Sequence, residues 1–269
     1  MTALDALDLA LPVTAALWGA ATGTLLPRAA HRFSVPAGED WRKECPAGHP
    51  IRGWLGTAHC AACTTPAPTP AEPVAADGED APQGPPAPAP APAPAPLALT
   101  TALVCTALAL ATGPRPELAV WLLLAPVGVL LAVVDFRVQR LPDPLTLPLA
   151  AAALALLGAA ALLPEHAGHW LTSLYAALAL GACYFLLFLV NPGGMGFGDV
   201  KLALGTGAVL GWYGWPTVLF GTFAGFLLGA LYGGALVVVR RAGRKTAIAF
   251  GPFLIAGAFA GLLVGAYTA

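Results

Sequence analysis

Two aspartates, Asp135 and Asp199, stand where an acidic side chain is costly to keep, and they are the first candidates for chemistry. Asp135 follows the apolar run LLAVV, and Asp199 follows the run NPGGMGFG and precedes another apolar stretch. Ionisable groups at the ends of membrane segments are functional candidates by default. Two carboxyl groups brought close cannot both ionise easily, so the pair shares one proton. Such a pair can hydrolyse a peptide bond, because one member deprotonates a water while the other donates to the scissile carbonyl.

Glycines surround the second aspartate, at positions Gly193, Gly194, Gly196 and Gly198. They permit positive φ angles and let a second backbone come close, as a loop that presents a carboxylate to an extended peptide requires. An ordinary turn between membrane segments needs neither four glycines nor a terminal acid. We therefore expect Gly196 and Gly198 to shape the site, and we group Lys201 with them.

Asp143 is a third acid on the same side of the two apolar segments that follow it. It stands between Pro142 and Pro144 and ahead of an apolar run. This is the arrangement of an N-cap aspartate followed by proline at the first helical position, so we expect Asp143 to be a cap first and a site-shaping residue second. We expect Arg137 and Arg140 to anchor the chain at lipid headgroups rather than to bind a substrate.

The composition places these residues in a membrane protein. Hydrophobic residues make up 58% of the 269 positions and charged residues 10%, with a mean hydropathy of +0.74. The net charge of -1 gives no basic surface for nucleic acid. We predict an all-α polytopic fold with about eight transmembrane helices, over residues 9–26, 97–113, 118–134, 145–163, 171–190, 200–210, 218–239 and 247–267.

The basic residues set an orientation, because positively charged loops stay in the cytoplasm. With the N-terminus outside, Arg115 alone of the 13 lies outside, and the cytoplasmic set is Arg28, Arg32, Arg42, Lys43, Arg52, Arg137, Arg140, Lys201, Arg240, Arg241, Arg244 and Lys245. Two crossings separate Asp135 from Asp199, so both acids are predicted at the cytoplasmic face of the inner membrane.

The chain divides into four predicted parts. Residues 1–27 form the first transmembrane helix, and residues 28–63 form a cytoplasmic lobe with three aromatic residues and three cysteines, here called the cysteine lobe. Residues 64–96 are an Ala- and Pro-rich tract with no apolar face to bury, which predicts a disordered linker. Residues 97–269 form the multi-span domain that holds both aspartates.

Three stretches resemble the type IV prepilin peptidases, a family in the GxGD group of membrane aspartic peptidases. They are DFRVQRLPDPLTLPL (135–149), GMGFGDVKLALGTGAVLGW (194–212) and AFGPFLIAGA (249–258). The resemblance implies that Asp135 and Asp199 are the catalytic dyad, needing no cofactor for proteolysis. It implies prepilins or pseudopilins as substrates, cut at the cytoplasmic face after a short basic leader, and the pilus or type II secretion machinery as partners beside the membrane lipids.

The N-terminal part departs from the family. Longer members carry two CxxC pairs suited to zinc, whereas this chain has Cys60 and Cys63 but only Cys45 of the other pair. His49 or His59 can supply a fourth ligand, and the alternative is a set of free thiols. The family associates this region with methylation of the new N-terminus by S-adenosylmethionine, and Pro27 replaces its usual asparagine here.

Two other classes remain open from the residues alone. In a proton-coupled transporter, Asp135 and Asp199 would be relay groups, and inverted repeats with a broken helix in each half would favour it. In a non-catalytic membrane scaffold, neither the glycines nor the two acids on one face are needed.

Overall fold

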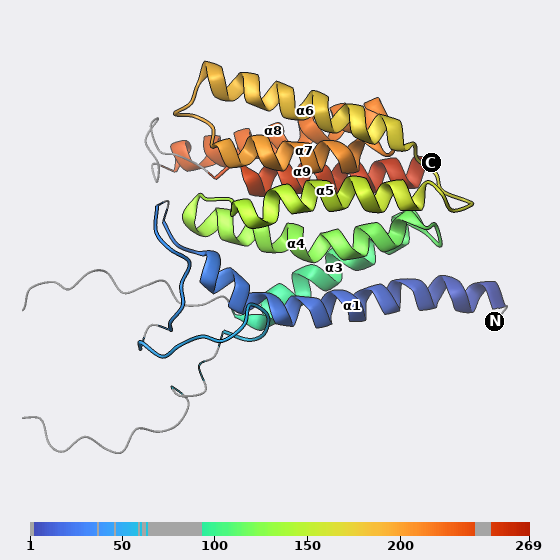
Figure 1. The fold of residues 1–269 in the computed structure, drawn as a ribbon. Coiled ribbons are helices and arrows are strands. Elements are labelled where there is room, and N and C mark those ends of the chain that lie inside the picture. The colour runs from blue at the N-terminus through green and yellow to red at the C-terminus, as the bar shows by residue number, and fades with distance from the viewer. Residues whose placement is uncertain are drawn as a thin grey trace, which may run out of the picture.

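The structure, a computed structural model, describes residues 3–36, 38–45, 47–58, 60, 63, 93–239 and 249–269. Helices account for nearly all of the regular structure in this part, and they pack side by side in one bundle (Figure 1). They are α1 (Ala3–Phe33), α3 (Pro94–Thr112), α4 (Glu117–Val138), α5 (Asp143–Ala160), α6 (Trp170–Val190), α7 (Phe197–Gly211), α8 (Trp215–Val238) and α9 (Gly251–Thr268). The predicted all-α fold is confirmed.

Seven of these helices are long and apolar enough to cross a membrane, all except α7. The chain is therefore a multi-pass membrane protein. Helix α7 has 15 residues, too short to cross the roughly 30 Å hydrocarbon core as a straight helix. Its C-terminal end lies beside the start of α6, because the backbone N–H of His169, just before α6, donates to the carbonyl of Trp212, just after α7, at 3.0 Å.

Close contacts at glycines bring α7 and α9 against their neighbours. A Cβ on Gly207 of α7 would lie 2.6 Å from the carbonyl oxygen of Ala176 in α6, and one on Gly225 of α8 would lie 3.0 Å from that of Phe253 in α9. Helices in lipid gain stability mainly from such close packing, since lipid is as apolar as they are. These two helices matter for the site, because Asp199 is in the first turn of α7 and Gly251 begins α9.

Helix α1 extends past its predicted end at residue 26 and continues through Pro27 to Phe33. Its last turns hold the cysteine lobe, since Arg28 Nη1 donates to the carbonyl of Arg52 at 3.0 Å and Arg32 Nη1 donates to that of Gly53 at 2.6 Å. The predicted lobe therefore begins on the helix itself. Helix α3 likewise begins inside the predicted linker, of which residues 64–92 lie outside the described part.

Candidate active site

Asp135 lies in the last turns of α4 and is almost fully buried, with 4% of its surface exposed. Its Oδ2 accepts a hydrogen bond of 3.0 Å from the backbone N–H of Gly251, the first residue of α9. The N-terminus of a helix carries a partial positive charge, which stabilises a carboxylate placed there. Gly251, which is 116 positions away in the sequence, thus holds the side chain of Asp135 in place.

Asp199 lies in the first turn of α7 and is 6% exposed. Its Oδ2 accepts a hydrogen bond of 3.2 Å from the backbone N–H of Gly196, the N-cap residue of the same helix. This is the side-chain-to-backbone half of a capping box, with the acid at the third helical position. The carboxylate therefore satisfies an N–H group that the start of α7 would otherwise leave without a partner.

Both aspartates line one cavity of about 970 Å³, here called the aspartate cavity. The connecting residue is Leu141, which follows α4 and is 7% exposed. It contacts Gly198 beside the second acid and approaches Gly251 beside the first. The structure thus brings into one cavity two acids that are 64 positions apart in the sequence.

The glycines around Asp199 act through close approach and not through unusual backbone angles. None of the four appears among the positive-φ residues of the described chain, so that part of the expectation is wrong. At Gly198, however, a Cβ would lie 2.9 Å from Cβ of Leu141, a rigid neighbour that cannot turn away. Glycine is needed there so that α7 can approach the segment after α4.

Asp143 is not a side-chain cap. Helix α5 begins at Asp143 itself, its N-cap residue is Pro142, and no side chain caps it. Proline on both sides fixes the backbone, and the carboxylate instead reaches Lys201 of α7, with Oδ1 at 2.7 Å from Nζ. Both residues line the aspartate cavity. The pair joins the start of α5 to the start of α7, next to Asp199.

Arg140 holds the cysteine lobe, a role that the sequence did not predict, and its role as a lipid anchor stays a prediction. Its Nη1 donates to the carbonyls of Pro36 at 2.8 Å and Glu39 at 3.2 Å, and its guanidinium lies 4.3 Å from the ring centre of Trp41. Arginine offers several donors in a fixed plane, which suits this combination of carbonyls and an aromatic face. Trp41 itself lines the aspartate cavity.

The sequence did not identify Gly251 or Trp41 as parts of this site. Gly251 had a signal, since it falls in the AFGPFLIAGA stretch, but its contact with Asp135 joins segments far apart in the chain. For Trp41, the sequence offered one indication of a role, namely that a large aromatic residue stands in a loop rich in polar residues.

Four side chains of the cysteine lobe form a second candidate centre. One ligand atom from each of Cys45, His49, Cys60 and Cys63 lies within 4.8 Å of all the others. Gly48 has a φ of 80° and turns the chain so that His49 follows Cys45 closely. Three sulfurs and one imidazole are a donor set that zinc takes in tetrahedral structural sites. His59, the alternative fourth ligand, lies outside the described residues.

The surroundings of Cys45 favour the thiolate form of its side chain. Burial raises its pKa, but hydrogen bonds from the backbone at His49 and Ala47 and from the side chains of His49 and Cys63 outweigh it and lower the pKa to about 6. Metals bind the thiolate and not the thiol. The four residues therefore fit a metal ion by geometry, and Cys45 also fits it by charge state, whereas the hydrogen bond with Cys45 raises the pKa of Cys63 to about 11.

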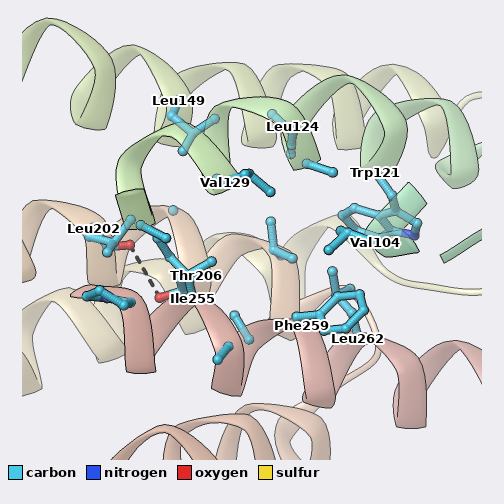
Figure 2. A pocket seen from close by; sticks show the side chains of 18 of the residues that line it. Val104, Trp121, Leu124, Val129, Leu149, Leu202, Thr206, Ile255, Phe259 and Leu262 are labelled. Carbon is cyan, nitrogen blue, oxygen red and sulfur yellow. Dashed lines mark hydrogen bonds between the residues drawn. The ribbon is translucent and has the colours of Figure 1, made fainter. Parts of the chain in front are cut away.

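A second cavity of about 450 Å³ lies deeper in the bundle (Figure 2). Its lining comes from α3, α4, α5, α7 and α9 and is almost wholly apolar, with Trp121 and Leu262 towards one end. Thr206 projects into it, but its hydroxyl already donates to the carbonyl of Leu202 at 3.3 Å. The described residues that line this cavity include no acid, whereas those that line the aspartate cavity include Asp135 and Asp199.

Comparison with known proteins gives a consistent result. Residues 122–234 match the type IV leader peptidase family. The chain is similar to proteins named prepilin leader peptidase/N-methyltransferase from three bacteria. The Aeromonas salmonicida protein is 38% identical over 152 residues, which are 54% of this chain and 48% of that protein. The Escherichia coli protein is 36% identical over 140 residues, 49% of this chain and 57% of that protein. The Pseudomonas aeruginosa protein is 33% identical over 156 residues, 55% of this chain and 48% of that protein.

This chain spans about half the length of the curated relatives it matches. No solved structure matches it.

Proposed function

Because residues 122–234 carry the sequence of the type IV leader peptidase family, we propose that this chain is a membrane aspartic endopeptidase that removes the leader peptide of type IV prepilins or pseudopilins. Asp135 and Asp199 are its catalytic dyad. The observation that carries the proposal is the meeting of these two buried acids, from separate helices, in one cavity. The same acids could relay protons in a transporter, but the family and the named relatives are peptidases.

The dyad works with one proton shared between the two carboxyl groups. The ionised aspartate takes a proton from a water molecule, whose oxygen bonds to the carbonyl carbon of the scissile peptide. The protonated aspartate donates to the carbonyl oxygen. The aspartate that took the proton from water gives it to the peptide nitrogen as the C–N bond breaks, and a hydroxyl of the intermediate returns its proton to the other aspartate. The leader leaves with a new carboxyl group, and the mature protein keeps a new N-terminal amine.

The glycine N–H groups keep both carboxylates in place for this reaction. Gly251 and Gly196 each hold one oxygen of an aspartate by a backbone bond that does not depend on a flexible side chain. Catalytic groups must be held within a fraction of an ångström, because small displacements cost much of the rate.

We place the site at the cytoplasmic face of the inner membrane, with the N-terminus outside. Arg28, Arg32 and Arg140 lie with the cysteine lobe at the end of the bundle that holds the aspartate cavity. Arg115 lies at the opposite end, where it donates to the carbonyl of Ala266 near the end of α9. This distribution supports the orientation, although the basic residues at 240–245 lie outside the described part.

The cysteine lobe is proposed to bind one zinc ion through Cys45, His49, Cys60 and Cys63. A bound ion would tie the two ends of this short segment together and so stabilise a lobe that has few apolar residues. Residues 28–63 then act as a unit attached to the multi-span peptidase domain, 97–269. The residues of the lobe would hold the metal, and the peptide hydrolysis above needs none of its chemistry.

Methyl transfer to the new N-terminal amine is a second candidate function. The relatives are named for both activities, and S-adenosylmethionine would be the methyl donor. Prepilins and the pilus or secretion machinery that uses them are the proposed partners.

One experiment tests the proposal. The purified chain is incubated with a prepilin-like peptide containing a basic leader and the start of an apolar helix, with and without S-adenosylmethionine, and the products are weighed by mass spectrometry. We expect one cut at the leader junction, and a further mass increase of one methyl group marks the second activity. An uncut peptide in the presence of folded protein would reject the peptidase.

A further inference from the structure

Among the described residues that line the aspartate cavity, one comes from outside the peptidase domain. Trp41 belongs to the cysteine lobe, and it lines the cavity together with Asp135 and Asp199. Tryptophan offers a large rigid surface that loses little conformational freedom on binding. Its position on the wall puts that surface within reach of whatever lies over the two acids.

Contacts on two sides hold Trp41 in place. The guanidinium of Arg140 lies 4.3 Å from its ring centre, and the ring of Phe33, the last residue of α1, meets it in an edge-to-face contact at 5.1 Å. Arg140 also donates to two carbonyls of the same lobe, those of Pro36 and Glu39. The orientation of Trp41 is thus set by a residue of the peptidase domain and by α1.

Trp54 of the same lobe provides an internal comparison. It stacks on Phe33 at 4.7 Å and lies under the guanidinium of Arg32 at 3.9 Å, so its surroundings closely match those of Trp41. It is 41% exposed and is not part of the cavity lining. If both tryptophans served only to hold the lobe together, their removal would have similar effects.

We propose that Trp41 is a substrate-binding residue of the peptidase reaction and that Arg140 is its positioning residue. The proposal rests on the peptidase function proposed above. The cysteine lobe lies at the face that we propose to be cytoplasmic, where the leader of the substrate is expected, so Trp41 packs on the leader side of the scissile bond. Its bound partner is an uncharged stretch of extended peptide, since the cation of Arg140 on the ring repels a basic side chain there.

Kinetics of the full-length chain with the prepilin-like peptide test the role of Trp41. We expect Trp41→Ala to raise KM about tenfold with kcat changed less than about twofold, because the lost contact is made in both ground and transition states. Trp41→Phe keeps an aromatic surface and should recover most of the affinity. Trp54→Ala, the matched control, should leave both constants near the wild-type values.

The role of Arg140 is tested by a double-mutant cycle. If Arg140 acts through Trp41, Arg140→Ala raises KM in the wild-type chain but adds little in the Trp41→Ala chain. A role in general lobe stability predicts additive effects instead, and would overturn the positioning role.

Photocrosslinking gives a readout that does not depend on turnover. In an Asp199→Asn chain, p-benzoylphenylalanine placed at position 41 should crosslink to the leader part of the peptide, and the same group at position 54 should not. Equal crosslinking at both positions, or equal changes of KM for Trp41→Ala and Trp54→Ala, would overturn the inference while cleavage by the wild-type chain continued. A wild-type chain that cleaves no such peptide would overturn the peptidase function itself, and this inference with it.

Discussion

Each catalytic aspartate proposed here accepts a hydrogen bond from a glycine N–H at the start of a helix, and the glycine bound to Asp135 has no room for a side chain. A Cβ on Gly251 would lie 2.7 Å from Oδ2 of Asp135. The carboxylate is the group that must move, because Gly251 is fixed as the first residue of α9. Even a small displacement of a catalytic group lowers the rate strongly.

We therefore predict that Gly251→Ala lowers kcat/KM by about 100-fold. Gly128→Ala is the matched control, because a Cβ there would meet only the Ile255 side chain, at an ordinary 3.8 Å. Leader cleavage by both variants is measured on the same peptide. Wild-type activity of Gly251→Ala would show that the position of Asp135 does not depend on this contact.

The ion pair between Asp143 and Lys201 is expected to contribute less to cleavage than the contact between Gly251 and Asp135. The Asp143 side chain is 66% exposed, and such pairs contribute about 0.2–1 kcal/mol. Asp143→Ala should therefore keep measurable cleavage and cost less than about 1 kcal/mol of stability. Cleavage kinetics and thermal unfolding of the variant check both points. If cleavage vanished with normal expression, Asp143 would have to join the dyad in the chemistry.

At the scale of the elements, hydropathy predicted most of the helices because each apolar run of membrane length has one stable solution in lipid. The boundaries were less predictable. The first helix continues through Pro27 because its last turns bind the cysteine lobe, a contact that no local pattern encodes. The glycines of α7 provide its packing surface, since Gly207 and Gly211 contact α6 and Gly205 contacts α5.

This packing gives a prediction for α7. Gly207→Leu should destabilise the protein by about 1–3 kcal/mol, because the new side chain meets the backbone of α6 at Ala176. Gly234→Leu in α8 is the control, since no atom of the described residues lies within 4 Å of a Cβ there. Thermal unfolding in detergent compares the two. Equal stability of the two variants would mean that α7 does not need its close contact with α6.

At the scale of the whole molecule, the aspartate cavity is built by parts far apart in the sequence. The sequence singled out the two acids through the charges at the ends of apolar runs and through the resemblance, and their catalytic role stays a prediction. Gly251, Trp41 and the partner of Asp143 could not be predicted, because each acts through a contact between separate segments. Sequence periodicity reports which face of a helix is buried but not which residue of another helix it meets.

The cysteine lobe extends the molecule beyond the bundle, and its proposed zinc ion can be measured directly. We predict about one zinc per purified chain, reduced by Cys60→Ser and unchanged by Cys183→Ser, whose thiol lies in α6 away from the cluster. Zinc loss should also lower the thermal stability of the protein. A metal content near zero in the wild-type chain would leave the cysteines as free thiols.

The central claim, that Asp135 and Asp199 act as one catalytic pair, is tested most directly by replacing each with asparagine and measuring leader cleavage by mass spectrometry. Asparagine keeps the shape of the side chain but cannot ionise or share the proton. We predict that either Asp135→Asn or Asp199→Asn alone lowers the rate by at least about 1,000-fold, while the variant still folds in the membrane. A variant of either residue that cleaves the leader at the wild-type rate would contradict the account.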